Sequence, residues 1–139
     1  MGVRNMDRGN AAIETLIKEN ELCEGKVELV QVDVTDQGSI DTAAESLKTT
    51  LGDEKLYGLV NNAGTIITPN VTKEMMFATN FYGPKLMSEA MIPLIDQNEG
   101  RIVNVGAIAA PMYVAKCDEN TKKFLSSQVL TWFDLEEFV

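Results

Sequence analysis

The chain has 139 residues, enough for one ordinary domain and too few for two. Hydrophobic residues make up 45% of it and charged residues 24%, which excludes a disordered tail, a collagen-like repeat and a disulfide-rich miniprotein. At a net charge of −9 it lacks the basic face that a general nucleic-acid binder needs. Because the chain contains no histidine, it cannot build a serine–histidine triad or a histidine–zinc site.

Several absences bear on where the protein works. The first residues lack the apolar run of a signal peptide, and no segment reaches the roughly 18–20 apolar residues of a membrane helix. Cys23 and Cys117 are far apart and show no Cys-x-x-Cys spacing, so we expect reduced thiols and no metal site. We therefore predict a cytoplasmic protein that binds neither membrane nor nucleic acid.

Short β-rich runs alternate with amphipathic helical segments along the chain, which is typical of βαβ units and a mostly parallel sheet. Thr35 or Asp36 can cap the second helix, while Gly25 and Gly52 are expected just past the ends of the first two helices. After residue 108 the pattern is weak, apart from a short helix capped at Thr131. We predict a single α/β unit with these elements in chain order: a strand end at 2–4, a helix at 7–20, a strand at 27–32, a helix at 35–51, a strand at 56–60, a helix at 72–97 and a strand at 102–105.

Small or hydrogen-bonding residues follow three of the predicted strands. Asn61-Asn62-Ala63-Gly64 comes directly after the third strand, where small residues allow a ligand to approach the backbone and the asparagines can bridge neighbouring strands. An ordinary turn would have the same composition. Asp33-Val34 and Gly106-Ala107 occupy equivalent positions after two other strands. Three such strand ends favour a ligand site at one edge of the sheet.

Four segments together resemble the short-chain dehydrogenase/reductase family in order and spacing. They are residues 32–36, 59–64, 80–83 and 100–105. The branch that looks most similar is the monomeric carbonyl reductases, which have a comparable Arg-x-x-x-Arg-Gly segment and an insert whose start resembles residues 109–139. The resemblance implies a partial doubly wound, Rossmann-like parallel sheet in one partial dinucleotide-binding domain, residues 1–139.

The same resemblance implies a site for NADP(H). Arg4 lies just past the strand that corresponds to the family's second strand, where it would face the adenosine 2′-phosphate. A carboxylate at that position would repel the phosphate. Asp33 would accept from the adenine amino group with Val34 under the ring. Simpler alternatives are a solvated charge at Arg4 and a helix-capping carboxylate at Asp33. The residues assigned to the cofactor are Arg4, Asp33, Val34, Asn61, Ala63 and Gly64.

Asn80 is the candidate catalytic residue, and we expect it on the buried face of the helix at 72–97. A buried amide without a partner costs about 1–3 kcal/mol, so its side chain should be hydrogen-bonded. Pro84 has no N–H to bond the Asn80 carbonyl, so that carbonyl should be free and the helix should bend there. The resemblance implies that Asn80 holds a water in a proton relay; a simple kink is the alternative.

Other family features are absent from the 139 residues. The ten glycines offer no Gly-x-x-x-Gly-x-Gly turn, no tyrosine is followed four residues later by lysine, and Ala107 stands where the resemblance places a catalytic serine. We therefore expect a fragment that lacks the first strand and the C-terminal strands. Open sheet edges would make its fold marginal or dependent on a partner or an oligomer.

Two functional hypotheses follow from these features. By resemblance, the complete protein would reduce a ketone, aldehyde or quinone to an alcohol by hydride transfer from NADPH, and this chain itself would be inactive. Alternatively, the chain is a non-catalytic remnant of the family that acts as a protein-interaction module. The loss of the serine hydroxyl at Ala107 favours the second hypothesis.

Overall fold

A computed structural model describes residues 1–138. The chain divides into two compact units, the first spanning Met1–Asn104 and the second beginning at Val105. The boundary falls close to residue 109, where the insert-like segment was expected to begin.

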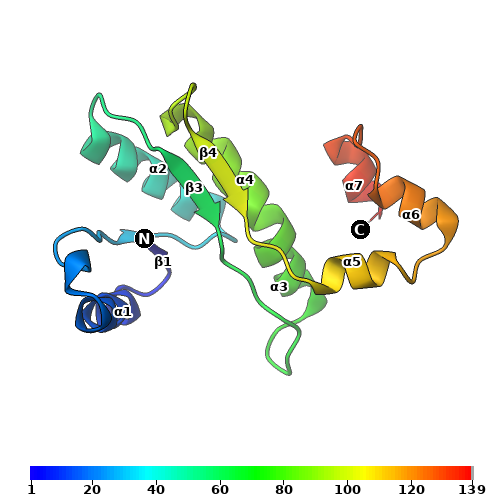
Figure 1. The fold of residues 1–139 in the computed structure, drawn as a ribbon, viewed down its shortest axis with the longest axis horizontal. Coiled ribbons are helices and arrows are strands. Elements are labelled where there is room, and N and C mark those ends of the chain that lie inside the picture. The colour runs from blue at the N-terminus through cyan, green and yellow to red at the C-terminus, as the bar shows by residue number, and fades with distance from the viewer. Residues whose placement is uncertain (139) are drawn as a thin grey trace. The chain divides into compact units, whose positions relative to one another are not determined.

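The first unit alternates short strands with helices, as the sequence predicts (Figure 1). Its elements are β1 (Gly2–Val3), α1 (Met6–Glu19), a 3-10 turn (Glu21–Cys23), β2 (Val30–Gln31), α2 (Gln37–Leu51), β3 (Gly58–Asn61), α3 (Lys73–Phe77), a π-helical turn (Ala78–Tyr82), α4 (Gly83–Met91), a second 3-10 turn (Ile92–Leu94) and β4 (Arg101–Asn104).

Both sheets are parallel. β1 pairs with β2, with Gly2 opposite Val30, and β3 pairs with β4 from Gly58 opposite Arg101 to Asn61 opposite Asn104. Within residues 1–138, no strand pairs with the second edge of β1 or of β3. The parallel, Rossmann-like arrangement is confirmed, but in place of one sheet there are two pairs of strands, as expected when the strand that would join them is missing.

Two sequence predictions about the first elements were wrong. The strand expected at 27–32 is only Val30–Gln31, because β1 offers just two residues for it to pair with. Gly25 does not end α1, although its φ is +68°. The helix stops at Asn20, whose side chain accepts from the backbone N–H of Leu22 at 3.1 Å and so begins the 3-10 turn. An asparagine side chain competes with the helix for backbone donors in this way.

The core of the first unit lies between α2, α4 and the residues that flank the strands. Ile40 is fully buried, and burying such a side chain contributes about 1.5–3 kcal/mol. α2 is placed by its cap, because Asp36 accepts from the Ser39 N–H at 2.7 Å, and Gly52 ends it with a φ of +59°. The buried hydrophobic residues are Val32, Ile40, Ala43, Met87, Met91 and Ile95.

The helix expected at 72–97 is present as four consecutive helical segments from Lys73 to Leu94, so it ends three residues earlier than predicted. Thr72 caps the start by accepting from the Met75 N–H at 3.3 Å. Because Pro84 has no N–H, the regular bonding pattern fails before it, and the Gly83 N–H instead reaches five residues back to the Ala78 carbonyl. This spacing defines the π turn, a form that often occurs at functional sites.

The second unit contains three short helices, α5 (Ala109–Val114), α6 (Glu119–Leu125) and α7 (Trp132–Phe138). The Phe124 and Phe138 rings stack with centroids 4.9 Å apart. The predicted cap of α7 is confirmed, because the Thr131 hydroxyl accepts from the Asp134 N–H at 3.2 Å. Both cysteines are free thiols. Among the helices of residues 1–138, none has the length and apolar character needed to cross a bilayer.

Candidate functional site

Asp33 follows β2 and is held by local hydrogen bonds. Its Oδ1 accepts from the Thr35 N–H at 2.9 Å and from the Thr35 hydroxyl at 2.7 Å, while its own N–H donates to Ser39 Oγ at 2.9 Å. The bonds from Thr35, and to a lesser degree the charge of Arg4, hold the pKa of Asp33 below its usual value. Asp36, not Asp33, caps α2, so the capping alternative for Asp33 was wrong. Because its pKa is lowered, the Asp33 carboxylate is ionised at neutral pH.

Arg4 lies at the end of β1, next to the strand that carries Asp33. Its carbonyl accepts from Gln31 Nε2 at 3.4 Å, and its exposed guanidinium acts on the Asp33 carboxylate. Val34 is half-buried, and a Cβ on Gly83 would lie only 3.1 Å from Val34 Cγ2. The end of β2 therefore packs closely against the first residue of α4.

Asn61 joins β3 to β4 and to α4. Its side chain is buried, at 8% exposed, and its Nδ2 donates to Asn104 Oδ1 at 2.8 Å and to Ser88 Oγ at 3.1 Å. The predicted bridge between strands by asparagine side chains is confirmed. Because this amide is engaged within the protein, any part that Asn61 plays in cofactor binding stays a prediction.

Asn80 clamps the loop after β3. Its Oδ1 accepts from the Thr65 N–H and its Nδ2 donates to the Thr65 carbonyl, both at 2.8 Å. The expected hydrogen-bonded partner is confirmed, but the expected burial was wrong. Asn80 is exposed because it sits in the π turn, whereas the buried face of the helix continues through Met87 and Met91. A Cβ on Gly64 would lie 3.6 Å from Asn80 Oδ1, so the exposed Ala63–Gly64 segment runs close to the clamp.

Most of the predicted site residues of the first unit meet around one stretch of helix, from the π turn to the first turns of α4. Asn80 holds the loop after β3, Val34 contacts Gly83, and Asn61 bonds Ser88. Arg4 and Asp33 follow the neighbouring strands β1 and β2, and the charge of Arg4 helps to lower the pKa of Asp33. Ala107 belongs to the second unit, where its carbonyl accepts from the Ala110 N–H at 3.1 Å.

Sequence reasoning missed the residues that hold these groups in place. Thr35 stands two positions after Asp33, the spacing of a local side-chain turn, which is a usable signal. Asn104 could have been paired with Asn61 by aligning the two strands. Ser88 and Thr65 have no local signal, because their partners lie 27 and 15 residues away.

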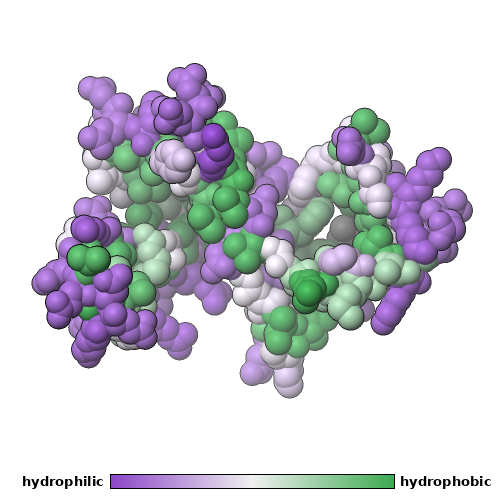
Figure 2. All heavy atoms as spheres, viewed as in Figure 1, coloured by the Kyte–Doolittle hydropathy of each residue, from purple (hydrophilic) through white to green (hydrophobic). Residues whose placement is uncertain are grey.

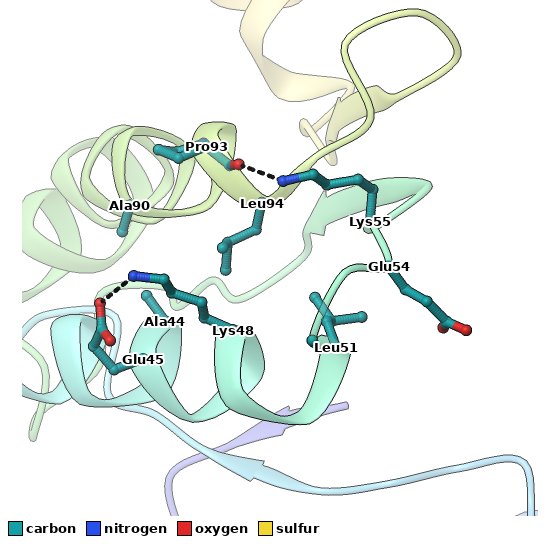
Figure 3. A pocket seen from close by; sticks show the side chains of 10 residues that line it. Ala44, Glu45, Lys48, Leu51, Glu54, Lys55, Ala90, Pro93 and Leu94 are labelled. Carbon is teal, nitrogen blue, oxygen red and sulfur yellow. Dashed lines mark hydrogen bonds and ion pairs between the residues drawn. The ribbon is translucent and has the colours of Figure 1, made fainter.

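A groove of about 270 Å³ lies elsewhere, between the C-terminal parts of α2 and α4 (Figure 3). Lys55 Nζ donates to the Pro93 carbonyl at 3.5 Å, and Lys48 Nζ lies 3.7 Å from a Glu45 carboxylate oxygen. Leu94 contributes an apolar wall. This groove is separate from the strand ends, which lie by the N-terminal parts of the same two helices.

Comparison with known proteins agrees with this arrangement. Residues 1–118 match the short chain dehydrogenase family. The chain is 38% identical over 130 residues to (+)-neomenthol dehydrogenase of Arabidopsis thaliana, an overlap that covers 75% of this chain and 43% of that protein. It is 41% identical over 91 residues to human 17-beta-hydroxysteroid dehydrogenase type 6, covering 60% of this chain and 28% of that protein.

Solved structures show the same fold. Menthone neomenthol reductase from Mentha piperita aligns with a TM-score of 0.75 at 27% identity, covering 99% of this chain and 61% of that one. The NADPH-bound carbonyl reductase from chicken fatty liver aligns with a TM-score of 0.60 at 24% identity, covering 78% of this chain and 46% of that one. The chain thus spans less than two thirds of the length of these relatives.

Proposed function

Since the chain belongs to the short chain dehydrogenase family, we propose that its strand ends form the adenosine side of an NADP(H) site in a carbonyl reductase. In the complete reaction, NADPH supplies a hydride to the carbonyl carbon of a ketone, aldehyde or quinone, and the carbonyl oxygen takes up a proton to give the alcohol. The chicken reductase, whose structure holds NADPH, supports the choice of cofactor.

The residues present fit the adenosine 2′-phosphate. Arg4 is exposed at the end of β1, and its positively charged guanidinium can attract the phosphate. Asp33 uses Oδ1 for Thr35, and within residues 1–138 its Oδ2 makes no hydrogen bond, which leaves an acceptor for the adenine amino group. The placement of Arg4 and Asp33 just past the ends of the adjacent parallel strands β1 and β2 is the observation that carries the proposal.

The residues of this chain do not complete a catalytic set. Asn80 would contribute its main-chain carbonyl, which Pro84 cannot bond, but Ala107 has no hydroxyl to polarise a substrate carbonyl. The spacing of four residues that would let a lysine lower the pKa of a tyrosine is absent from the 139 residues. We expect the 139-residue chain to bind cofactor without turning over a carbonyl substrate.

The test is a fluorescence titration of the chain with NADPH and with NADH. We expect tighter binding of NADPH, and we expect Arg4→Ala to weaken NADPH binding roughly tenfold or more while leaving NADH nearly unchanged, because only NADPH carries the 2′-phosphate. Lys48→Ala is the matched control, since it removes one positive charge beside the separate groove. Equal loss in both variants, or no binding by the unaltered chain, would contradict the proposal.

A second candidate is a protein-interaction module, which two observations favour. Ala107 replaces the expected serine, and the face of β3 and β4 exposes Val60 at 61% and Val103 at 49%. Figure 2 shows hydrophobic residues gathered over these two strands. The NADPH titration separates the two functions, because an interaction module that has lost the cofactor site should bind neither NADPH nor NADH.

A further inference from the structure

We propose that Ser88 is a positioning residue: its hydroxyl ties the buried Asn61–Asn104 pair to Pro84 and so fixes the π turn that carries Asn80. The consequence for catalysis rests on the proposed function, in which Asn80 belongs to the reacting side of the site. The coupling itself is a property of the fold and can be tested without cofactor.

The Ser88 hydroxyl is both a hydrogen-bond donor and a hydrogen-bond acceptor. It donates its proton to the Pro84 carbonyl at 2.6 Å and accepts from Asn61 Nδ2 at 3.1 Å. The Asn61 amide has two hydrogens, of which the other goes to Asn104 Oδ1 at 2.8 Å. A third acceptor, the Pro84 carbonyl, lies 3.5 Å from Asn61 Nδ2. One hydroxyl therefore connects both strands of a sheet to the first turn of α4.

Pro84 links the Ser88 hydrogen bonds to the π turn that contains Asn80. The π turn exists because Pro84 cannot donate, and it closes where the Gly83 N–H bonds the Ala78 carbonyl. Holding the Pro84 carbonyl fixes the residue that follows this closure. Asn80 lies within the turn, and its two bonds to Thr65 depend on where the turn places it. The strands and the loop after β3 are thus anchored to the same short stretch of helix.

A purely local role for Ser88 is the alternative. Serine and threonine in helices commonly bond the carbonyl four residues back, and Thr79 does so here with Met75 at 2.9 Å. Ser88 differs because its oxygen also accepts from a buried amide on another element. If Ser88 is replaced by alanine, Asn61 loses one acceptor and the Pro84 carbonyl loses its short bond, so the effect should reach Thr65.

The experiment is site-resolved amide hydrogen exchange on the 139-residue chain by NMR. In Ser88→Ala, we expect the Thr65 and Gly83 amides to exchange about tenfold faster or more, while the amides of α2 keep their rates. Ser88→Thr retains the hydroxyl and should restore the original rates. Thr79→Val, which removes a local bond in the π turn itself, should leave Thr65 unchanged.

A merely structural role gives a different pattern. Equal acceleration at Thr65 and throughout α2, or no acceleration at Thr65, would overturn the proposal, as would fast exchange at all amides of the unaltered chain. If Ser88→Ala abolishes protection at all amides, Ser88→Cys is measured instead, because its thiol is a weaker donor and acceptor but still fills the site. It should also speed exchange at Thr65 and Gly83 while the amides of α2 keep their rates. Failure to bind NADPH with the exchange pattern intact would count against the proposed function alone.

Discussion

Asp33 shows how neighbouring groups can fix the direction and the charge of one side chain. Two donors from Thr35 converge on one of its carboxylate oxygens, and the nearby positive charge of Arg4 adds to their effect. The pKa of Asp33 is therefore lowered, and the carboxylate is both ionised and fixed in direction. A group held in this way loses little freedom when it accepts a hydrogen bond from a ligand.

This arrangement predicts how stability depends on pH. The pKa of Asp33 in the folded chain lies below its ordinary value of 3.8, so its stabilisation is fully present above that value and is lost as pH falls through the folded-state pKa. Thr35→Val removes the hydroxyl donor and should lower the free energy of unfolding by about 1 kcal/mol at neutral pH. The difference should vanish in strong acid.

Urea unfolding at a series of pH values measures this effect. Thr42→Val is the control, because the Thr42 hydroxyl donates to the Gly38 carbonyl of its own helix at 2.8 Å and not to a carboxylate. Its small effect should not depend on pH. A Thr35→Val difference that persists unchanged at low pH would show that the hydroxyl does not act through Asp33.

At the scale of elements, the first unit is joined by a few side-chain amides. Asn61 links β3, β4 and α4, while Asn80 links the π turn to the loop after β3. Parallel strands that end at the same edge bring such residues together, and this is where ligands bind in open α/β sheets. The same contacts thus hold the fold and shape the candidate site.

Removal of the Asn61 amide should therefore be costly. Asn61→Ala leaves the Asn104 side-chain oxygen and the Ser88 hydroxyl without their donor, and we expect a loss of about 1–3 kcal/mol in the free energy of unfolding. Urea unfolding followed by circular dichroism gives the value. The neighbouring Asn62→Ala, at an exposed position, should change stability by less than about 0.5 kcal/mol.

Local chemistry decided which parts of the fold the sequence could predict. The missing N–H of Pro84 predicted a local irregularity in the helix, Asp36 and Thr131 were candidate caps, and the asparagines predicted a bridge between strands. The π form and the exposure of Asn80 were not predictable, because they depend on how distant segments pack around the helix. Strand lengths failed for the same reason, since a strand extends only as far as its partner.

At the scale of the whole molecule, the strand edges of β1 and β3 that stay unpaired within residues 1–138 should limit stability. Their unpaired backbone groups and the exposed valines of β3 and β4 should leave the isolated chain only marginally stable and prone to associate. We expect a broad thermal transition whose midpoint rises with protein concentration. Circular dichroism at several concentrations tests this expectation, and a sharp, reversible transition that is independent of concentration would refute it.

The most direct test of the central claim is an NMR titration of the isotope-labelled chain with adenosine 2′,5′-bisphosphate, which carries the part of NADP(H) assigned to this chain. The account predicts that the amide signals of Arg4, Asp33 and Val34 move together as the site fills. Signals that stay still at these residues, or that move only around Lys48 and Lys55 in the separate groove, would contradict it.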